Sequence, residues 1–462
     1  MRALGSPVPT LNIWMNGELV GEWTTSRTGT PILRYAESWT ESRRARALSL
    51  SLPITPDREI RGNIVDYYFD NLLPDNPDIR RRIRDRYGLK STDAFDLLEE
   101  IGRDCVGAVQ LLPPDRKPDH WNTIDGTALS TANVERELQA VLAPARGPRS
   151  EEDDGFRISI AGAQEKTALL MMGDTWYRPR HATPTTHILK LPLGIIGNFR
   201  GDFSNSVENE WLCSQFLHQL GLPVAHTEMA KFGELRALVV RRFDRRWVGV
   251  EESVEERSGF LPGVGVWIAR LPQEDFCQAT GRPPTQRYES DSGPSMNEIL
   301  EILATSAHAE RDRANFVLAQ LTFWLLAATD GHAKNFSIHH LVGGAFEMTP
   351  LYDVLSAWPV IGRGANQLPI QDAKLAMAVA GKNRHYKVVD ILPRHWQALA
   401  TRIGGPALWD RMQSLVDEAP RAFDRIKLPR GFPDVVLSRI SEGVREQSRK
   451  FLRALRLQPK AG

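Results

Sequence analysis

The sequence predicts an α+β fold in which a strand-rich half is followed by a helix-rich half, and three observations support this. Strand-like patterns dominate up to about residue 294, and helical patterns dominate from Ser295 to the end. Segregated strands and helices are typical of α+β folds rather than of alternating α/β folds. The composition, 42% hydrophobic and 25% charged, is that of a globular protein, and 462 residues suffice for roughly two to four domain-sized units. We expect two lobes with a cleft between them.

The first unit, residues 1–112, combines strands and helices. The stretch "LNIWMNGELVGEW", Leu11–Trp23, alternates around an Asn-Gly pair, which predicts a β-hairpin. From Asp57 to Leu112 apolar residues recur at three- and four-residue spacing, which indicates helices, with breaks at Pro74 and Gly102. We therefore predict an N-terminal α+β subdomain.

A polar linker with one helix is expected over residues 113–155. It opens with "PPDRKPDHWNTIDG" and closes with "APARGPRSEEDDG", and both stretches are rich in residues that interrupt regular structure. Between them, Asn133 to Leu142 has the spacing of a helix.

The third predicted unit comprises residues 156–462, with a strand-rich part over 156–294 and a helix-rich part over 295–462. One helix interrupts the strands, "SVENEWLCSQFLHQLG", and Gly221 is its expected C-cap. The expected strands are "FRISIAG" (156–162), "EKTALLMM" (165–172), "THILKLP" (186–192) and "LRALVVRRFD" (235–244).

Charge and cysteine usage exclude several classes of protein. The 58 Lys and Arg residues balance 57 Asp and Glu residues, so the net charge of +1 indicates no global preference for nucleic acid. Cys105, Cys213 and Cys277 are odd in number and far apart, which argues against a disulfide framework and a cysteine zinc site. The N-terminus has no signal-peptide pattern, and no apolar run approaches about 18 residues, so we expect a cytoplasmic protein without a membrane span.

The stretch "AATDGHAKNFS" crowds polar groups directly after the apolar run "LTFWLLAA". Within it, Asp330 and Asn335 have the D-x-x-x-x-N spacing of a protein-kinase catalytic loop, where the Asp accepts the substrate hydroxyl's proton and the Asn binds magnesium. A carboxylate must lie near the attacking oxygen, while an amide oxygen a short turn away reaches the metal beside the phosphates. Asp353, eighteen residues beyond Asn335, stands where a kinase has its second metal-binding carboxylate.

The other parts of a kinase precede this loop in the expected order. Lys190 in "THILKLP" is a candidate for contact with the α- and β-phosphates of ATP. Either Glu208 or Glu210 on the following helix could hold that lysine in place. Further upstream, "SIAGAQEK", Ser159 to Lys166, has small residues that let backbone N–H groups approach phosphates. Together these features predict ATP and Mg²⁺ as cofactors.

Each of these features alone also has a simpler explanation. A D-x-x-x-x-N match arises by chance, and Asp330 with Asn335 could form only a turn that caps the preceding helix. Lys190 could be a surface lysine with a buried stem, and His332 a packed histidine. "AGAQEK" has a single glycine, which makes it a poor phosphate loop by pattern. The correct order of all the parts favours the kinase interpretation.

Longer motifs connect the chain to a known family. They are "FRISIAGAQEKTALL", "PTTHILKLP", "RRFDRRW", "RLPQEDFCQ", "YESDSGP", "ATDGHAKNFS" and "YDVLSAWP", together with "LSLSLP", "FDNLLPD" and "FDLLEEIGRDCVGAVQLLP" nearer the N-terminus. On these residues the chain resembles the HipA-type serine/threonine kinase toxins of bacterial toxin–antitoxin systems, from about residue 11 to 440.

The resemblance implies a divergent, bilobal protein-kinase-like domain with a helix-rich C-terminal lobe. It implies that Asp330 is the catalytic base, that Asn335 and Asp353 are the magnesium ligands, and that Lys190 contacts ATP. The further ATP-site residues that it implies are Ala161, Gly162, Ala163, Gln164, Glu165 and Lys166 over the phosphates, Arg241, Arg242 and Phe243 at the adenine hinge, and His332, Ala333, Lys334, Asn335 and Tyr352 along the wall.

By the same resemblance, Ser159 corresponds to the family's autophosphorylated serine. A phosphate there would add nearly two negative charges to the loop that receives the phosphates of ATP. The resulting repulsion would displace or disorder the loop and switch the enzyme off.

The resemblance also implies partners. The target class is aminoacyl-tRNA synthetase, typically the glutamyl enzyme, whose phosphorylation halts translation and yields growth arrest and persistence. The usual antitoxin is HipB, a small helix-turn-helix protein that binds operator DNA as a dimer and holds the toxin inactive. The basic run "GKNRHYK", with Lys382, Arg384 and Lys387, is a candidate contact for DNA phosphates, although a solvated loop explains it equally well.

Departures from ordinary kinases leave alternatives open. "ATD" stands in place of "HRD", "YDV" in place of "DFG", and no G-x-G-x-x-G loop is visible, which puts ordinary kinase regulation in doubt. Val248–Val266 looks like an insertion that could alter target choice. The competing interpretations are a catalytically weak corepressor of an antitoxin–operator complex and a small-molecule phosphotransferase.

Overall fold

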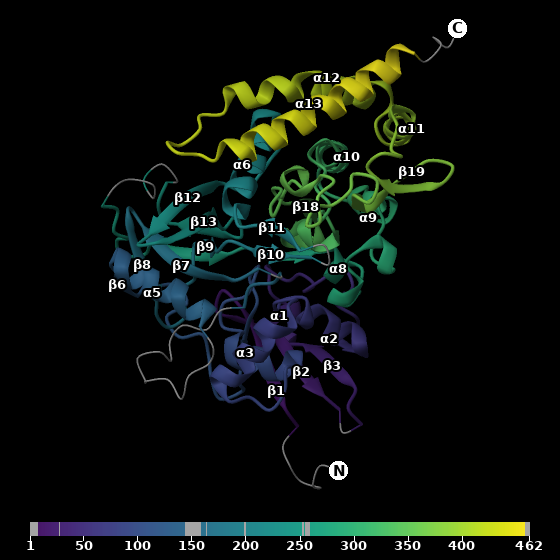
Figure 1. Ribbon diagram of the computed structural model, residues 1–462. Coiled ribbons are helices and arrows are strands. Elements are labelled where there is room, and N and C mark those ends of the chain that lie inside the picture. Colours follow the sequence, from purple (N-terminus) through teal and green to yellow (C-terminus); the bar gives the residue numbers. More distant parts are fainter. Residues whose placement is uncertain are drawn as a thin grey trace.

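The computed structural model shows three parts stacked on one another, and it describes residues 8–26, 28–143, 159–162, 164–197, 200–251, 254 and 259–457. In Figure 1 the N-terminal part (purple) lies at the bottom, a sheet with its helices (blue to teal) lies above it, and long C-terminal helices (yellow) lie at the top. The predicted α+β fold is confirmed. No helix in the described ranges is long and apolar enough to cross a membrane.

The N-terminal part is a five-stranded antiparallel sheet packed against helices. Its elements are β1 (Thr10–Met15), β2 (Glu18–Thr25), β3 (Pro31–Tyr35), α1 (Glu37–Thr40), β4 (Glu59–Arg61), α2 (Asn63–Asp70), α3 (Pro77–Tyr87), α4 (Ala94–Ile101) and β5 (Gln110–Leu112). The strand order is β4-β3-β2-β1-β5. The predicted hairpin is confirmed as β1–β2, and Asn16 and Gly17 have φ angles of 45° and 84°, as the tight turn between two twisted strands requires.

The stretch from Asp57 to Leu112, expected to be helical, also contains two strands, so that prediction was incomplete. β4 and β5 span three residues each and form the two edges of the sheet. Three residues are too few to show the alternation that identifies a strand in a sequence. The predicted breaks are present, because Pro74 separates α2 from α3 and Gly102 is the C-cap of α4.

The middle part is a six-stranded antiparallel sheet. Its main elements are β6 (Gly126–Leu129), α5 (Thr131–Leu142), β7 (Lys166–Met172), β8 (Thr175–Pro179), β9 (His187–Lys190), α6 (Ser206–Gln219), β12 (Thr227–Phe232) and β13 (Leu235–Arg241). The order β12-β13-β9-β7-β8-β6 places β9 in the interior of the sheet. The strands predicted at 165–172, 186–192 and 235–244 and the helix at 206–221 are confirmed, and Gly221, with φ of 73°, follows the C-cap.

Two predictions for this part need correction. Residues 113–143 contribute the edge strand β6 to the sheet as well as the predicted helix, which is α5. Ser159–Gly162 does not form the strand expected over 156–162, and a single isolated bridge joins Gly162 to Pro74. The segment pairs with the N-terminal part instead of the sheet, which its own sequence does not reveal. Residues 144–155 and Phe156–Ile158 lie outside the described residues.

Two hairpins accompany the sheet. They are β10 (Gly194–Ile196) with β11 (Gly201–Phe203), and β14 (Arg245–Val248) with β15 (Trp267–Arg270). The stretch Val248–Val266, interpreted as an insertion, connects β14 to β15, and its residues 252, 253 and 255–258 lie outside the described ones.

The C-terminal part is mostly helical, as predicted from Ser295 onward. Its elements are β16 (Gln273–Asp275), α8 (Phe276–Ala279), α9 (Met296–Leu303), α10 (Ala309–Leu326), β17 (Ser337–His340), β18 (Phe346–Met348), β19 (Lys374–Ala380), β20 (Arg384–Lys387), α11 (Pro393–Ile403), α12 (Gly405–Ala422) and α13 (Asp434–Arg456). Short 3-10 helices join them: η2 (Pro284–Gln286), η3 (Glu289–Asp291), η4 (Ala333–Asn335), η5 (Val342–Gly344), η6 (Trp358–Val360) and η7 (Phe423–Arg425). Every residue of α10 from Phe316 to Leu326 is buried, because α9, α11, α12 and α13 pack around it.

A buried ion cluster joins the N-terminal part to the middle part. The carboxylate of Asp104 lies 2.9 Å from a guanidinium nitrogen of Arg245 and 3.1 Å from one of Arg270. Asp244 lies 2.7 Å from Arg242 and 2.9 Å from Arg245. None of the five side chains is more than 7% exposed. Burial opposes the ionisation of Asp104, but the arginines hold its pKa far below the usual range.

Removal of the Asp104 carboxylate should destabilise the folded protein. Asp104→Ala leaves buried guanidinium groups without a partner, so we expect a loss of about 3–5 kcal/mol in the free energy of unfolding at pH 7, measured by urea denaturation. The folded-state pKa of Asp104 is depressed, so its contribution is present above the unfolded pKa and is lost as pH falls. The difference between wild type and variant should therefore shrink below about pH 4.

The matched control is Asp115→Ala, which removes an exposed carboxylate. It should change the free energy of unfolding by less than about 0.5 kcal/mol. Equal stability of Asp104→Ala and Asp115→Ala would show that the ion cluster does not hold the parts together.

Candidate active site

A cleft of about 1270 Å³, its open mouth included, lies where the three parts meet. The predicted site residues that line it are Ala161, Gly162, Lys166, Lys190, Arg241, Arg242, Phe243, Asp330, His332, Lys334, Asn335, Tyr352 and Asp353. Ser159, Gln164, Glu165 and Ala333 lie next to it without lining it, and Ala163 lies outside the described residues. Asn71, Leu72 and Asp75 of the N-terminal part also line the cleft, which no pattern in the sequence indicated.

Lys190 ends β9 inside the cleft and carries a double ion pair. The neighbouring strands place Leu238 on one side of it and Lys166 on the other. Lys190 Nζ donates hydrogen bonds to Glu210 Oε1 at 2.6 Å and to Asp353 Oδ1 at 2.8 Å. One cation thus joins the sheet, helix α6 and the segment after β18.

The structure distinguishes the two glutamates that the sequence left open. Glu210 pairs with Lys190, whereas Glu208 pairs with Arg236 of β13. Residues two positions apart on a helix do not share a face, so only one of them can reach the cleft.

The charges around Lys190 shift one another's pKa values. Burial raises the pKa of Glu210 to about 7. Burial opposes the charge of Lys190, but Asp353 and Glu210 raise its pKa above the usual range. Burial also opposes the ionisation of Asp353, yet the ammonium groups of Lys190 and Lys166 lower its pKa to about 2. Asp353 is therefore a carboxylate at neutral pH, as a magnesium ligand must be.

The loop after α10 holds Asp330 and Asn335 in one tight turn. The His332 N–H donates to the Asp330 carbonyl at 2.8 Å, and the Asn335 N–H donates to the His332 carbonyl at 2.9 Å. Asn335 Nδ2 also donates to the Asp330 carbonyl, at 2.7 Å. A Cβ at Gly331 would lie 2.3 Å from the ring of Phe323, so only glycine fits between the loop and α10. The buried helix thereby fixes the loop.

The Asp330 carboxylate lies at the cleft with 62% of its side chain exposed. The Tyr288 hydroxyl donates to Asp330 Oδ1, and the Tyr288 ring stands edge-on to His332, with centroids 5.0 Å apart. Burial is the larger cause that raises the pKa of Tyr288, and the negative charge of Asp330 raises it further, so the Tyr288 hydroxyl remains a donor at neutral pH. One carboxylate oxygen is thus held, and the other is left to accept a proton. No pattern in the sequence indicates this role for Tyr288, which precedes Asp330 by 42 residues.

Lys334, expected along the wall of the ATP site, reaches the N-terminal part. Its Nζ donates to the backbone carbonyl and to Oδ1 of Asn71, at 2.9 and 2.8 Å. Carboxylate oxygens of Asp75 and Asp275 lie 3.6 and 3.5 Å away. Burial opposes its charge, but these two carboxylates raise the pKa of Lys334. The N-terminal part therefore anchors the loop that carries Asp330.

Gly162 and Lys166 form the loop side of the cleft. Gly162 has φ of 106°, and a Cβ there would lie 2.6 Å from Lys166 Nζ. The Gly162 carbonyl accepts the Asp75 N–H at 3.1 Å, which ties the loop to the N-terminal part. Burial and then Lys190 lower the pKa of Lys166 to about 8, so the ammonium form still predominates at neutral pH.

Ser159, the predicted modification site, is completely buried in this state. Its Oγ donates to the Leu72 carbonyl at 2.7 Å, and its N–H donates to the Asp104 carbonyl at 3.1 Å. A doubly charged phosphate on this oxygen would face carbonyl oxygens, so the segment must leave its place before a phosphoryl group can be carried there.

Three predicted site residues direct their side chains away from the cleft. Gln164 donates to the Leu191 carbonyl, and Glu165 pairs with Arg82 of α3. The guanidinium group of Arg242 belongs to the buried ion cluster. The Arg242 guanidinium group therefore has its carboxylate partners within the protein.

Phe243 and Tyr352 give the cleft an aromatic wall. Their ring centroids lie 5.5 Å apart at 42°. The Tyr352 hydroxyl donates to the Lys334 carbonyl at 2.8 Å, which connects this wall to the loop of Asp330. An aromatic wall next to a charged end suits a planar base that carries phosphates.

Asp353 and Asn335 fit a magnesium ion that is bound together with phosphates. Within the described part of the chain, no three His, Cys, Asp or Glu side chains gather into a metal site made of protein alone. Magnesium instead binds through one or two carboxylates plus substrate phosphates. Because Asn335 Nδ2 is used on the Asp330 carbonyl, its amide oxygen is left for a ligand.

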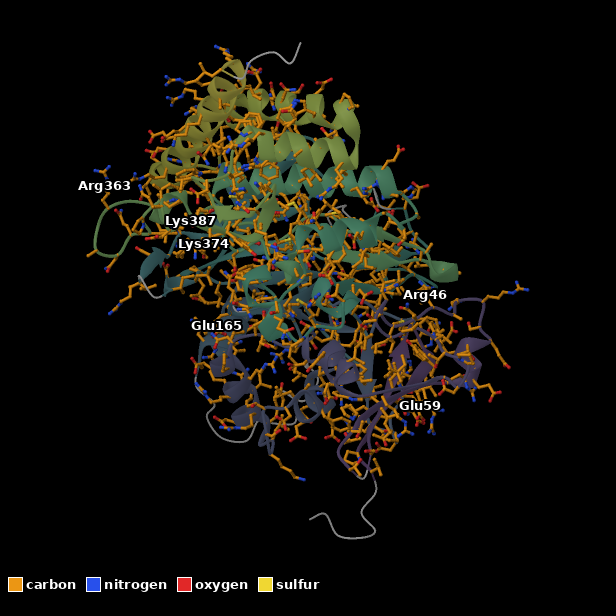
Figure 2. All side chains as sticks on the ribbon, turned by 90° about the vertical axis from the view of Figure 1, so that its right-hand side faces the viewer. Arg46, Glu59, Glu165, Arg363, Lys374 and Lys387 are labelled. Carbon is orange, nitrogen blue, oxygen red and sulfur yellow. The ribbon has the colours of Figure 1, made fainter. Side chains whose placement is uncertain are left out.

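The basic run that was considered for DNA lies on the β19–β20 hairpin, away from the cleft. Lys382 is exposed in its turn, and Arg384 and Lys387 belong to β20. Arg384 and Lys387 have carboxylates 3.7 and 4.0 Å away. Lys374 is the cross-strand partner of Lys387, and Figure 2 shows both at one edge of the helix-rich part.

Comparisons with known proteins add to this geometry. Two family models match, the HipA N-terminal domain over residues 11–112 and the HipA-like C-terminal domain over 158–426. "Putative kinase Y4mE" of Sinorhizobium fredii is 31% identical over 431 residues, 91% of this chain and 92% of that protein. "Serine/threonine-protein kinase toxin HipA" of Shewanella oneidensis is 26% identical over 362 residues, 75% of each chain. The fold is similar to a Shewanella oneidensis MR-1 complex of HipA, HipB and operator DNA, with a TM-score of 0.74, 21% identity, and coverage of 96% of this chain and 98% of that one.

The contact of Lys334 with Asn71 should appear as an energetic coupling. In a double-mutant cycle of Lys334→Met and Asn71→Ala, we expect a coupling energy of about 0.5–3 kcal/mol in the free energy of unfolding, because each side chain is the other's buried partner. Urea denaturation of the four proteins measures it. Lys334→Met combined with Asp115→Ala is the control and should be additive. Additivity of Lys334→Met with Asn71→Ala would contradict the anchoring role of Lys334.

Proposed function

The chain belongs to the HipA family, and on this premise we propose that it is an ATP- and Mg²⁺-dependent serine/threonine protein kinase that acts as a toxin. The observation that carries the proposal is the ion triad of Lys190, Glu210 and Asp353 in the same cleft as Asp330 and Asn335. Phosphoryl transfer needs a lysine at the phosphates, a carboxylate for the metal and a base for the acceptor hydroxyl.

The mechanism follows from these positions. Asp330 accepts the proton of the substrate hydroxyl as the hydroxyl oxygen attacks the γ-phosphorus. A new O–P bond forms, the bond from the γ-phosphorus to the oxygen that bridges to the β-phosphorus breaks, and ADP leaves with that electron pair. Lys190 and Lys166 hold the phosphates and offset their charge. Mg²⁺ held by Asp353 and Asn335 would supply further positive charge beside the phosphates.

The proposed substrate is an aminoacyl-tRNA synthetase, and the glutamyl enzyme is the first to assay. The support is the resemblance of the long motifs and the similarity to a relative named as a serine/threonine-protein kinase toxin. Phosphorylation of the synthetase would stop tRNA charging and so cause growth arrest and persistence in the cytoplasm.

A HipB-like helix-turn-helix antitoxin is the proposed partner that inhibits the kinase and brings it to operator DNA. The supporting observation is that the similar Shewanella oneidensis structure contains HipA, HipB and operator DNA. On this chain, the proposed contacts for DNA phosphates are Lys382, Arg384 and Lys387 of the β19–β20 hairpin.

Loss of the proposed base should abolish phosphoryl transfer. After incubation with Mg-ATP, wild type that starts unphosphorylated should gain one phosphate and Asp330→Ala none, because the variant cannot accept the hydroxyl proton. Intact-mass spectrometry measures this, with Asp115→Ala as a control that gains phosphate like wild type. Asp330→Ala should also fail to arrest growth while keeping its fold.

Three results would count against this proposal in different ways. No gain on wild type would argue against the kinase and favour the corepressor. A gain on folded Asp330→Ala would leave the kinase in place and refute the role of Asp330. Turnover with free sugars or antibiotics but with no protein acceptor would favour the small-molecule phosphotransferase.

The gained phosphate should map to Ser159 and silence the enzyme. In the phosphorylated protein we expect the affinity for ATP to fall at least about tenfold. The reason is that the added charge displaces the segment Ser159–Gly162, which lies at the cleft, from the carbonyls of Leu72 and Asp104. Peptide mapping and calorimetry measure these effects, and Ser159→Ala should keep its ATP affinity after the same incubation. Unchanged ATP affinity in protein fully phosphorylated on Ser159 would rule out this form of silencing.

A further inference from the structure

Besides Arg241 and Arg242, which adjoin Phe243, four lysine and arginine side chains line the described part of the cleft, and they differ in whether a carboxylate pairs with them. Lys190 pairs with Glu210 and Asp353, and Lys334 lies between two carboxylates of its own. Among the described residues, no ion pair includes Lys166 or Arg287, although both line the cleft. Lys166 belongs to the loop side, and Arg287 belongs to the side of Asp330.

Arg287 is held rigidly next to the catalytic loop. It stands between η2 and η3, and its carbonyl accepts the Ala333 N–H at 3.1 Å. One guanidinium nitrogen donates to the Pro284 carbonyl at 3.2 Å, and the guanidinium carbon lies 5.3 Å from the centre of the Tyr288 ring. Because the Tyr288 hydroxyl donates to Asp330, a single side chain separates Arg287 from the proposed base.

Polar atoms at this end of the cleft are buried without a hydrogen-bond partner. Among the described residues that line the cleft there are five such atoms: Arg287 Nε, Asp75 Oδ1 and His332 Nδ1, together with Thr227 Oγ1 and Gln273 Oε1. A buried donor of a cationic group is unfavourable when it has no acceptor, and an anionic ligand in the cleft would supply one to Arg287 Nε. Burial opposes the charge of Arg287, but Asp75, Tyr288 and Asp330 raise its pKa, so the side chain remains a cation.

We propose that Arg287 binds the phosphoryl group that is transferred, on the side opposite Lys166. The inference rests on the proposed kinase function and adds a residue that touches the reacting group. The planar guanidinium fork matches the oxygens of a phosphoryl group better than an ammonium does. The O–P bond to the substrate forms as the bond to the β-phosphate oxygen breaks, and negative charge develops on the equatorial oxygens of the phosphoryl group. Arg287 stabilises this charge and stays protonated throughout.

A structural role for Arg287 makes a different prediction. If the guanidinium group only packs on Tyr288 and bonds to Pro284, its removal should affect stability and should weaken ATP and ADP binding alike. A contact with the transferred phosphoryl group distinguishes the two nucleotides, because ADP lacks that group.

The test measures ATP and ADP affinity by calorimetry in magnesium buffer, and phosphoryl transfer with Mg-ATP, for wild type and variants. Arg287→Gln should weaken ATP binding about tenfold and ADP binding by less than about twofold, since a charged hydrogen bond is lost only with ATP. The kcat of transfer should fall about 10²–10³-fold. Arg287→Lys should recover part of kcat, because it keeps the charge but loses the fork.

Arg282→Gln is the matched control, since Arg282 lies on the same connecting segment, pairs with Glu298 and does not line the cleft. It should leave both affinities and kcat unchanged. Equal weakening of ATP and ADP by Arg287→Gln, or no weakening of either, would overturn the proposal. If wild type binds ATP without transferring phosphate while Arg287→Gln selectively loses ATP affinity, the kinase function fails and the contact with the terminal phosphate holds.

Discussion

The buried network of Asp104, Asp244, Arg242, Arg245 and Arg270 is the constraint on which the placement of the cleft depends. Charges removed from water are tolerated only when their partners surround them, so the N-terminal part must dock before the arginines of the middle part are satisfied. The backbone carbonyl of Asp104 also binds the N–H of Ser159. One residue of the N-terminal part therefore positions both the segment after β13 and the segment that leads to the phosphates.

The N-terminal part makes a second attachment on the opposite wall. Asn71 receives the ammonium group of Lys334, which lies in the same turn as Asp330 and Asn335. The N-terminal part thus contacts the middle sheet through an ion cluster and the Asp330 loop through a buried lysine, and it closes one side of the cleft between them. This explains why a subdomain outside the kinase-like part contributes Asn71 and Asp75 to its site.

Pairing of charges explains the chemistry that the cleft can support. Protein carboxylates pair with Lys190 and Lys334, whereas Lys166 and Arg287 have no such partners among the described residues. Lys190, which pairs with Asp353, and Lys166 keep the Asp353 carboxylate ionised. A ligand with several negative charges complements this arrangement, and the aromatic pair of Phe243 and Tyr352 adds a surface for a flat ring.

Local sequence patterns were reliable where one short stretch contains its own constraint. Asp330 and Asn335 are neighbours because a tight turn joins them. In the same way, the Asn-Gly pair predicts the β1–β2 turn, and helical spacing predicts α6. Long motifs were also sufficient to recognise the HipA family, which the comparisons confirm. Three features could not be predicted in this way: the edge strands β4 and β5, the pairing of Ser159–Gly162 with the N-terminal part, and the pairing of Glu210 rather than Glu208 with Lys190. Tyr288 contacts a residue 42 positions away and Lys334 one 263 positions away. No window of sequence contains both members of such a pair, because only the packing of the three parts brings them together.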